Sequence, residues 1–271
     1  MNKHISYRSS ELLNSLLQNG KLFFTLGEAG KILSKSDPAA VRRLVSDMTK
    51  RGLILRIKDG LYTIIPYEKD AENFFPDWHL TAEALVQPQK YYIGFYSALD
   101  IHGLITQPSL IEQVVTEKQV VPKYRTIKKV RFEFITMGKR FFGCNKTWID
   151  DFNKVYCSDL EKTILDCVYL PGKANGVAEI IKAINKSISK INEEKLIAYL
   201  NKFESQAVTK RLGFILENMN ELKDVREKIN NEISSSYTLL DSSLPKKGKH
   251  NARWKIIDNV GIDSALKSVM T

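Results

Sequence analysis

Hydrophobic positions near the N-terminus recur at the spacing of helices. Leu12, Leu13, Leu16 and Leu17 share one face of a helix predicted over Ser9–Gln18, which Gly20 ends. A short strand is expected over Leu22–Phe24. A second helix follows Thr25, a suitable N-cap, and runs to about Leu33.

The next stretch predicts a third helix over Asp37–Arg51. Val41, Leu44, Val45 and Met48 form its apolar stripe. Asp37 is expected to cap it, Pro38 suits its first turn, and Gly52 ends it.

A hairpin follows this helix directly. Two strands, Leu53–Ile57 and Leu61–Ile65, flank the tight-turn pair Asp59-Gly60. Three helices followed by a two-stranded wing predict a winged helix-turn-helix.

Pro66 and Pro76 then punctuate a polar segment, which places a domain boundary near Lys69. We therefore expect a winged helix-turn-helix domain over residues 1–69 and a larger mixed α/β domain over residues 70–271, in the α+β class. The second domain should contain a helix ending at Gly103 and another opened by a capping box of Ser158 and Glu161. Its other predicted elements are strands at 111–121, 129–137 and 141–148, helices near 176–189, 193–203, 206–219 and 222–233, and late strands 237–241 and 253–257, which should rejoin the earlier sheet.

The chain of 271 residues is basic, with a net charge of +10. Residues 1–70 hold 12 Lys and Arg against 7 Asp and Glu, a net of +5 and thus half of the excess. This balance favours an anionic partner such as nucleic acid. The N-terminus lacks the pattern of a signal peptide and no run has the length of a membrane span, so we expect a cytoplasmic protein without a membrane partner. Three widely spaced cysteines fit buried free thiols in a reducing compartment.

The third helix carries the candidate DNA-binding face, because small and basic residues lie opposite its apolar stripe. Arginine can bond guanine edges, whereas lysine and serine can hold phosphates. Asp47, at the edge of this face, would repel phosphate. The predicted DNA-binding residues, including the two before the helix and two on the hairpin, are Lys35, Ser36, Ala39, Arg42, Arg43, Ser46, Lys50, Arg56 and Lys58.

A second basic cluster precedes the last predicted strand. It either extends a nucleic-acid contact, with Trp254 stacking on bases, or is a solvated loop whose tryptophan belongs to the core. Its members are Lys246, Lys247, Lys249, Arg253 and Lys255.

We find no sequence pattern of a catalytic set, a metal site or a cofactor site. The four histidines are isolated, and the Gly-Lys pair at 172–173 lacks the rest of a phosphate loop. The protein is therefore expected not to be an enzyme. An alternative is a nucleic-acid-modifying enzyme that would use Asp150, Asp151 or Asp166, although these have simpler interpretations as turn and helix-surface residues.

Four stretches, taken in order, resemble the AbiEi family of antitoxins from type IV toxin–antitoxin (abortive infection, phage defence) systems. They are the helix and wing in "RRLVSDMTKRGLILRIKDGLYTI", then "YSALDIHGL" (Tyr96–Leu104), "VYCSDLEKTILDCVYLP" (Val155–Pro171) and "RLGFILE" (Arg211–Glu217).

This resemblance implies a transcriptional regulator that binds inverted repeats in its own promoter and represses its operon. It also implies a functional partner, a co-encoded nucleotidyltransferase-like toxin, which the second domain counteracts without needing a stable complex. The family's helix-and-wing positions correspond to Arg42, Arg43, Ser46, Lys50 and Lys58. Because one wing reads few base pairs, two copies are expected on DNA. A plain winged-helix regulator without a toxin is a further alternative.

Overall fold

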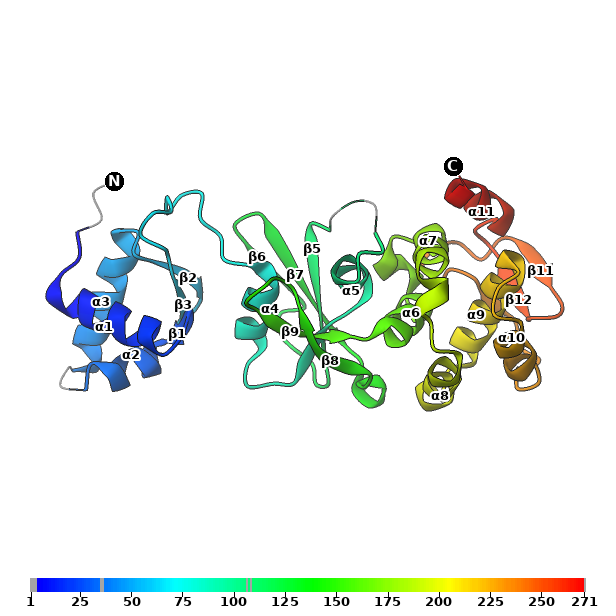
Figure 1. Ribbon diagram of the computed structural model, residues 1–271, viewed down its shortest axis with the longest axis horizontal. Helices are drawn as coiled ribbons and strands as arrows, with labels where there is room; N and C mark the ends of the chain where they lie inside the picture. The colour runs from blue at the N-terminus through cyan, green and yellow to red at the C-terminus, as the bar shows by residue number, and fades with distance from the viewer. Residues whose placement is uncertain (1–3, 35–36, 106, 108, 271) are drawn as a thin grey trace. The chain divides into compact units, whose positions relative to one another are not determined.

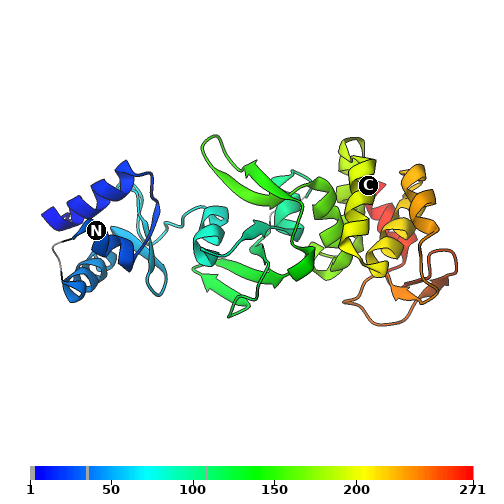
Figure 2. The same ribbon diagram turned by 90° about the horizontal axis from the view of Figure 1, so that it is seen from below.

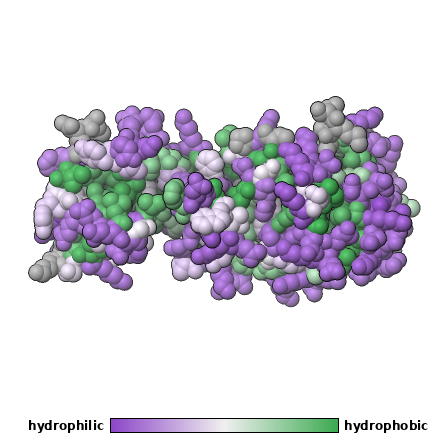
Figure 3. Space-filling model, viewed as in Figure 1, coloured by the Kyte–Doolittle hydropathy of each residue, from purple (hydrophilic) through white to green (hydrophobic). Residues whose placement is uncertain are grey.

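The computed structural model describes residues 4–34, 37–105, 107 and 109–270, with the side chains of 268–270 left undescribed. It divides into two compact units, residues 1–88 with 127–129, and the remainder from Gln89 onward (Figure 1). The α+β class predicted from the sequence is confirmed. The hydrophilic and hydrophobic residues of one face are mapped in Figure 3.

The first unit contains four helices and a three-stranded sheet among its described residues. The strands lie in the order β1-β3-β2, and both pairings are antiparallel. Its elements are α1 (Tyr7–Gln18), β1 (Phe23–Thr25), α2 (Leu26–Ile32), α3 (Pro38–Lys50), β2 (Ile54–Lys58), β3 (Leu61–Ile64) and α4 (Trp78–Val86).

Local chemistry explains the helix starts in this unit. Thr25 opens α2 in a full capping box with Glu28, each satisfying a backbone amide of the other. Pro38 lies at the start of α3 as predicted. The prediction for Asp37 was wrong in detail, because it occupies the N-cap position but its side chain forms no capping hydrogen bond.

The core of the first unit is apolar and brings its first three helices together. Leu12 and Leu16 of α1 pack with Val41, Val45 and Met48 of α3. Leu17 was predicted on the same apolar face but is exposed, which corrects that part of the prediction. Arg51 then ties the end of α3 to α1, because its guanidinium donates to the Ser9 hydroxyl at 3.1 Å.

The first unit extends beyond the boundary predicted near Lys69. Helix α4 belongs to it, and Lys58 Nζ on β2 donates to the Leu85 carbonyl oxygen at 2.7 Å. A cation at the C-terminal carbonyls of a helix is favourable, so this contact attaches α4 to the hairpin. The prolines of the connecting segment therefore mark a turn within the unit.

The second unit is built on a six-stranded mixed sheet in the order β6-β7-β5-β4-β9-β8. Strands β5 and β7 are parallel, as are β4 and β9, whereas β4 with β5 and β8 with β9 are antiparallel. The strands and the first helix are β4 (Tyr91–Ile93), α5 (Phe95–Ile101), β5 (Ile111–Thr116), β6 (Tyr124–Ile127), β7 (Val130–Thr136), β8 (Cys144–Trp148) and β9 (Lys154–Ser158).

Helices gather at one end of this sheet, as Figures 1 and 2 both show. The helices predicted over 193–203 and 206–219 have those bounds in the structure. The helices after β9 are α6 (Leu160–Tyr169), α7 (Val177–Ser187), α8 (Glu193–Phe203), α9 (Gln206–Met219), α10 (Lys223–Asn230) and α11 (Ile262–Met270), with short 3-10 turns at Pro171–Ala174 and Ile188–Lys190. Another short 3-10 turn, Gly138–Arg140, lies between β7 and β8.

The late strands do not rejoin the six-stranded sheet, which corrects our prediction. Instead β10 (Thr238–Leu239), β12 (Ile256–Asp258) and β11 (Lys249–Asn251) form a separate small sheet in that order. Trp254 anchors this small sheet to α9, because its buried ring packs over Gly213 and its indole N–H donates to Glu217 Oε2 at 2.6 Å. A Cβ at position 213 would lie 2.0 Å from this ring.

Helix α6 starts differently from the prediction. Its N-cap is Asp159, which accepts a hydrogen bond from the Lys162 amide at 3.0 Å, rather than Ser158 in a capping box. Glu161 instead accepts from the Asn192 amide and pairs with Lys195, and burial of Ser158 directs its hydroxyl to Thr163. Both side chains of the predicted capping box therefore bond to other residues instead of to each other's backbone amides.

A buried ion pair lies at the centre of α6. Lys162 and Asp166 are fully buried and joined by a short contact, and Tyr92 of β4 donates its hydroxyl to Asp166 at 3.0 Å. The rings of Phe142 and Phe203 flank the ammonium group at 5.1 and 5.2 Å. Burial lowers the pKa of Lys162 and raises that of Asp166, since it disfavours both charges.

Removing both partners of this pair should cost much less than the two single removals added together. Lys162→Met alone and Asp166→Leu alone each leave a buried charge unpaired and should each lower the free energy of unfolding by about 3–5 kcal/mol. The double variant should lose much less than the sum. Urea unfolding followed by Trp254 fluorescence, in a Trp78→Phe, Trp148→Phe background, measures this; additive losses would contradict it.

Candidate nucleic-acid interface

Helix α3 is held by its apolar stripe and exposes a polar face. Val41, Val45 and Met48 are buried, which leaves the opposite side free of contacts with the core. Five predicted residues are exposed on α3, and at 100° per residue they cover one side of the helix: Ala39, Arg42, Arg43, Ser46 and Lys50.

The remaining predicted DNA-binding residues do not belong to this exposed face of α3. Lys35 and Ser36 lie outside the described residues. Arg56 forms an exposed ion pair with Asp59 across the turn of the hairpin. Lys58 is engaged with the Leu85 carbonyl oxygen, so its ammonium serves the attachment of α4.

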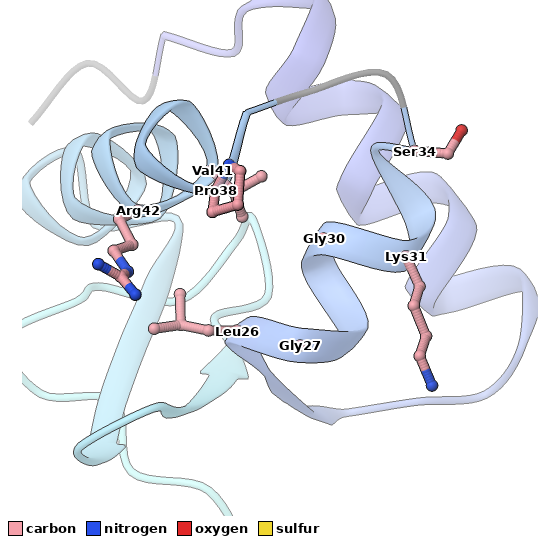
Figure 4. Close-up of a pocket in the computed structure, with 8 residues that line it drawn as sticks. All are labelled: Leu26, Gly27, Gly30, Lys31, Ser34, Pro38, Val41 and Arg42. Carbon is pink, nitrogen blue, oxygen red and sulfur yellow. The ribbon is translucent and has the colours of Figure 1, made fainter.

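A groove lies beside the exposed face, between α2 and α3 (Figure 4). Its volume is about 670 Å³. Arg42 lines it and also belongs to the exposed face, so the two surfaces are continuous. The lining residues are Leu26, Gly27, Gly30, Lys31, Ser34, Pro38, Val41 and Arg42.

Gly27 and Gly30 have no packing reason to be glycine. A Cβ at Gly30 would meet no described atom within 4 Å, and one at Gly27 would meet only the Thr25 hydroxyl oxygen at 3.8 Å. Glycine inside a helix costs about 1 kcal/mol relative to alanine. The two glycines therefore leave the backbone of α2 exposed in the groove, and they lower the stability of this helix.

The charge along this surface is mainly positive. Arg42, Arg43 and Lys50 form no ion pair with any residue that the structure describes. Asp47 is exposed next to Arg43 on the helix and is the acidic side chain that opposes an anion. Glu28 on α2 is compensated by Lys21, whose hydrogen bond lowers the pKa of the carboxyl group.

The second basic cluster divides into exposed and engaged residues. Lys246, Lys247 and Lys249 are exposed, Arg253 pairs with Glu217 at 3.1 Å, and Lys255 lies 5.7 Å from the Tyr237 ring. Trp254 belongs to the core and cannot stack on a base, which excludes that part of the stacking hypothesis.

The carboxylates considered for an enzyme have other roles. Asp166 is fully buried in its ion pair, which corrects its interpretation as a helix-surface residue. Asp150 accepts hydrogen bonds from the backbone amides of Phe152 and Asn153, as a turn residue does. Within the described ranges no group of three or more His, Cys, Asp or Glu side chains is arranged to hold a metal ion.

The sequence did not reveal the buried ion pair because a Lys and an Asp four residues apart are usual on a solvated helix. The signal present was the apolar surroundings of α6, in which Ile164, Leu165, Cys167 and Val168 leave little room for an exposed face.

Residues from the sequence motifs of the second unit form hydrogen bonds to neighbouring elements. His102 Nε2 lies 2.8 Å from the Ser158 carbonyl oxygen, which joins the end of α5 to β9. The Arg211 guanidinium donates to the carbonyl oxygens of Val168 and Tyr169 at the end of α6 and of Leu239 on β10. These residues hold helices and strands together, so their role in this chain is structural.

Comparison with solved structures finds a likeness of fold. The crystal structure of the Rv2827c protein from Mycobacterium tuberculosis matches with a TM-score of 0.73 and 12% identity, over 99% of this chain and 96% of that chain. No protein-family model and no curated protein sequence matches. In the described part of the chain, no helix has the length and apolar character needed to cross a membrane.

Replacing Gly30 with alanine should raise the stability of the first unit. The new methyl group meets open space, and alanine favours a helix by about 1 kcal/mol. Thermal unfolding should therefore occur at a higher temperature in Gly30→Ala. Gly213→Ala is the matched helix control and should strongly destabilise the second unit, because its Cβ meets the Trp254 ring. A loss of stability in Gly30→Ala would show an undetected packing constraint.

Proposed function

We propose that the first unit is a winged helix-turn-helix and that the protein is a DNA-binding transcriptional regulator of its own operon. The observation that carries this proposal is the exposed face of α3, where Arg42, Arg43 and Lys50 project from a helix whose other side is locked into an apolar core. Such a helix can enter a major groove without rearrangement.

The surroundings of α3 favour duplex DNA over other anions. The groove that α2 and α3 share has two glycines, which allow a phosphate backbone to approach closely, and Lys31 and Arg42 line the same groove. The hairpin of β2 and β3 carries Arg56 in an exposed ion pair, which contributes little to stability and can be exchanged for a phosphate contact.

By its resemblance to AbiEi antitoxins, we extend the proposal to the second unit. It would counteract a co-encoded nucleotidyltransferase-like toxin without a stable complex, while two copies of the first unit occupy inverted repeats in the promoter. Growth of cells expressing an adjacent gene of that class, with and without this chain, tests this part. Equal growth arrest in both would reject it.

Removing two charges from α3 should weaken operator binding. Arg43→Ala with Lys50→Ala should reduce affinity for the upstream duplex at about 150 mM salt by roughly tenfold or more, and should lower the slope of log K against log salt by about 1.8. Fluorescence anisotropy measures both. The matched control is Lys186→Ala with Lys190→Ala, which removes two exposed charges from the second unit. Equal affinities of the two double variants would reject the assignment.

A further inference from the structure

Exposed aromatic side chains cluster on the hairpin of β8 and β9. Trp148 is 57% exposed, Tyr156 39% and the tip residue Phe152 88%. Three large rings within nine residues form an unusual concentration on a protein surface, and such apolar patches mark interaction sites. The two strands lie side by side in Figure 1.

The register places each strand aromatic opposite a lysine on the same face. Lys146 pairs with Tyr156 and Trp148 pairs with Lys154 in the antiparallel ladder. Residues directly opposite in such a ladder project to the same side. The face therefore alternates lysine and aromatic residues along both strands.

The lysines lie against the rings without ion pairs. Lys154 Nζ is 4.0 Å from the Trp148 ring centroid, and Lys146 Nζ is 5.6 Å from that of Tyr156. Neither ammonium forms an ion pair with a described residue. The acidic residues of this hairpin, Asp150 and Asp151, lie in the turn and outside the two strands.

Hydrogen bonds order the backbone of the hairpin turn, and a neighbouring ring supports Tyr156. Asp150 Oδ1 accepts from the Phe152 and Asn153 amides at 2.8 and 2.7 Å, and Ile149 donates to Asn153 across the turn at 3.1 Å. The Tyr91 ring supports the Tyr156 ring edge-on at 6.0 Å. Binding on this surface would therefore need little ordering of the chain.

We propose that the β8–β9 hairpin binds single-stranded nucleic acid, with bases stacked on Trp148, Tyr156 and Phe152 and phosphates held by Lys146 and Lys154. Planar rings interleaved with cations match unstacked bases on a phosphate backbone. Duplex DNA keeps its bases stacked and cannot use the rings. A protein partner would have to desolvate two lysines, which is costly unless it supplies matching carboxylates.

The test uses the full chain and labelled oligonucleotides of about 12 residues, (rU) and (dT), in about 50 mM salt, with anisotropy as the readout. Trp148→Leu with Phe152→Leu keeps apolar bulk but removes planar stacking, and should weaken binding by roughly tenfold or more. Trp148→Phe should largely retain it. Lys146→Gln with Lys154→Gln should lower the salt slope by about 1.4, unlike Lys186→Gln with Lys190→Gln.

Two further measurements separate this site from the first unit. The hairpin variants should bind the upstream duplex as the wild type does, and Arg43→Ala with Lys50→Ala should still bind the single strands. The proposal is wrong if the wild-type chain binds neither oligonucleotide, or if the leucine variant binds them equally well. It is also wrong if the hairpin substitutions change only the oligomeric mass, because the surface then serves a second copy of the chain.

Discussion

The ion pair between Lys162 and Asp166 is the constraint around which the second unit is arranged. Both charges are removed from water on one helix, and the cost is tolerable because Tyr92, the flanking rings and the pairing itself compensate them. Helix α6 is consequently buried along most of its length and lies among α5, α7, α8 and α9. The Arg211 guanidinium donates to carbonyl groups in the last turn of α6, and Asp159 caps its first turn. A helix satisfied in this way at both ends is a fixed support for the sheet.

The two units place their charges in opposite ways. The first unit has a core of apolar side chains and keeps Arg42, Arg43 and Lys50 at the surface, where a ligand can meet them. The second unit buries charged residues: the Lys162–Asp166 pair of α6 lies inside, and so does the Glu133 carboxylate, which pairs with the exposed Lys123 and the partly exposed Lys173. Its net positive charge is therefore a poor guide to where it binds anything. The exposed lysines beside aromatic rings on the β8–β9 hairpin are a better guide to where it binds a ligand, because they are accessible.

Local patterns predicted much of the secondary structure, since periodicity and capping are properties of neighbouring residues. The bounds of α8 and α9, the Thr25 cap and the turn at Gly60 follow from such patterns. The errors arose where distant residues compete for the same group. Glu161 was predicted to cap its own helix, yet Lys195 and the Asn192 amide engage it. Asp166 was assigned to a surface because no local pattern reveals that β4 brings Tyr92 over it.

The sequence by itself determined where helices and turns form and which side of α3 is polar, because these depend on the order of residues within a few turns. The tertiary structure decided which side chains remain available. Lys58 is taken by the carbonyl of Leu85, and Trp254 is sealed over Gly213, whereas Trp148 and Phe152 stay exposed on a hairpin. Each outcome depends on what a distant segment covers. Whether a side chain is covered depends on packing in three dimensions, which the composition of a short stretch does not specify.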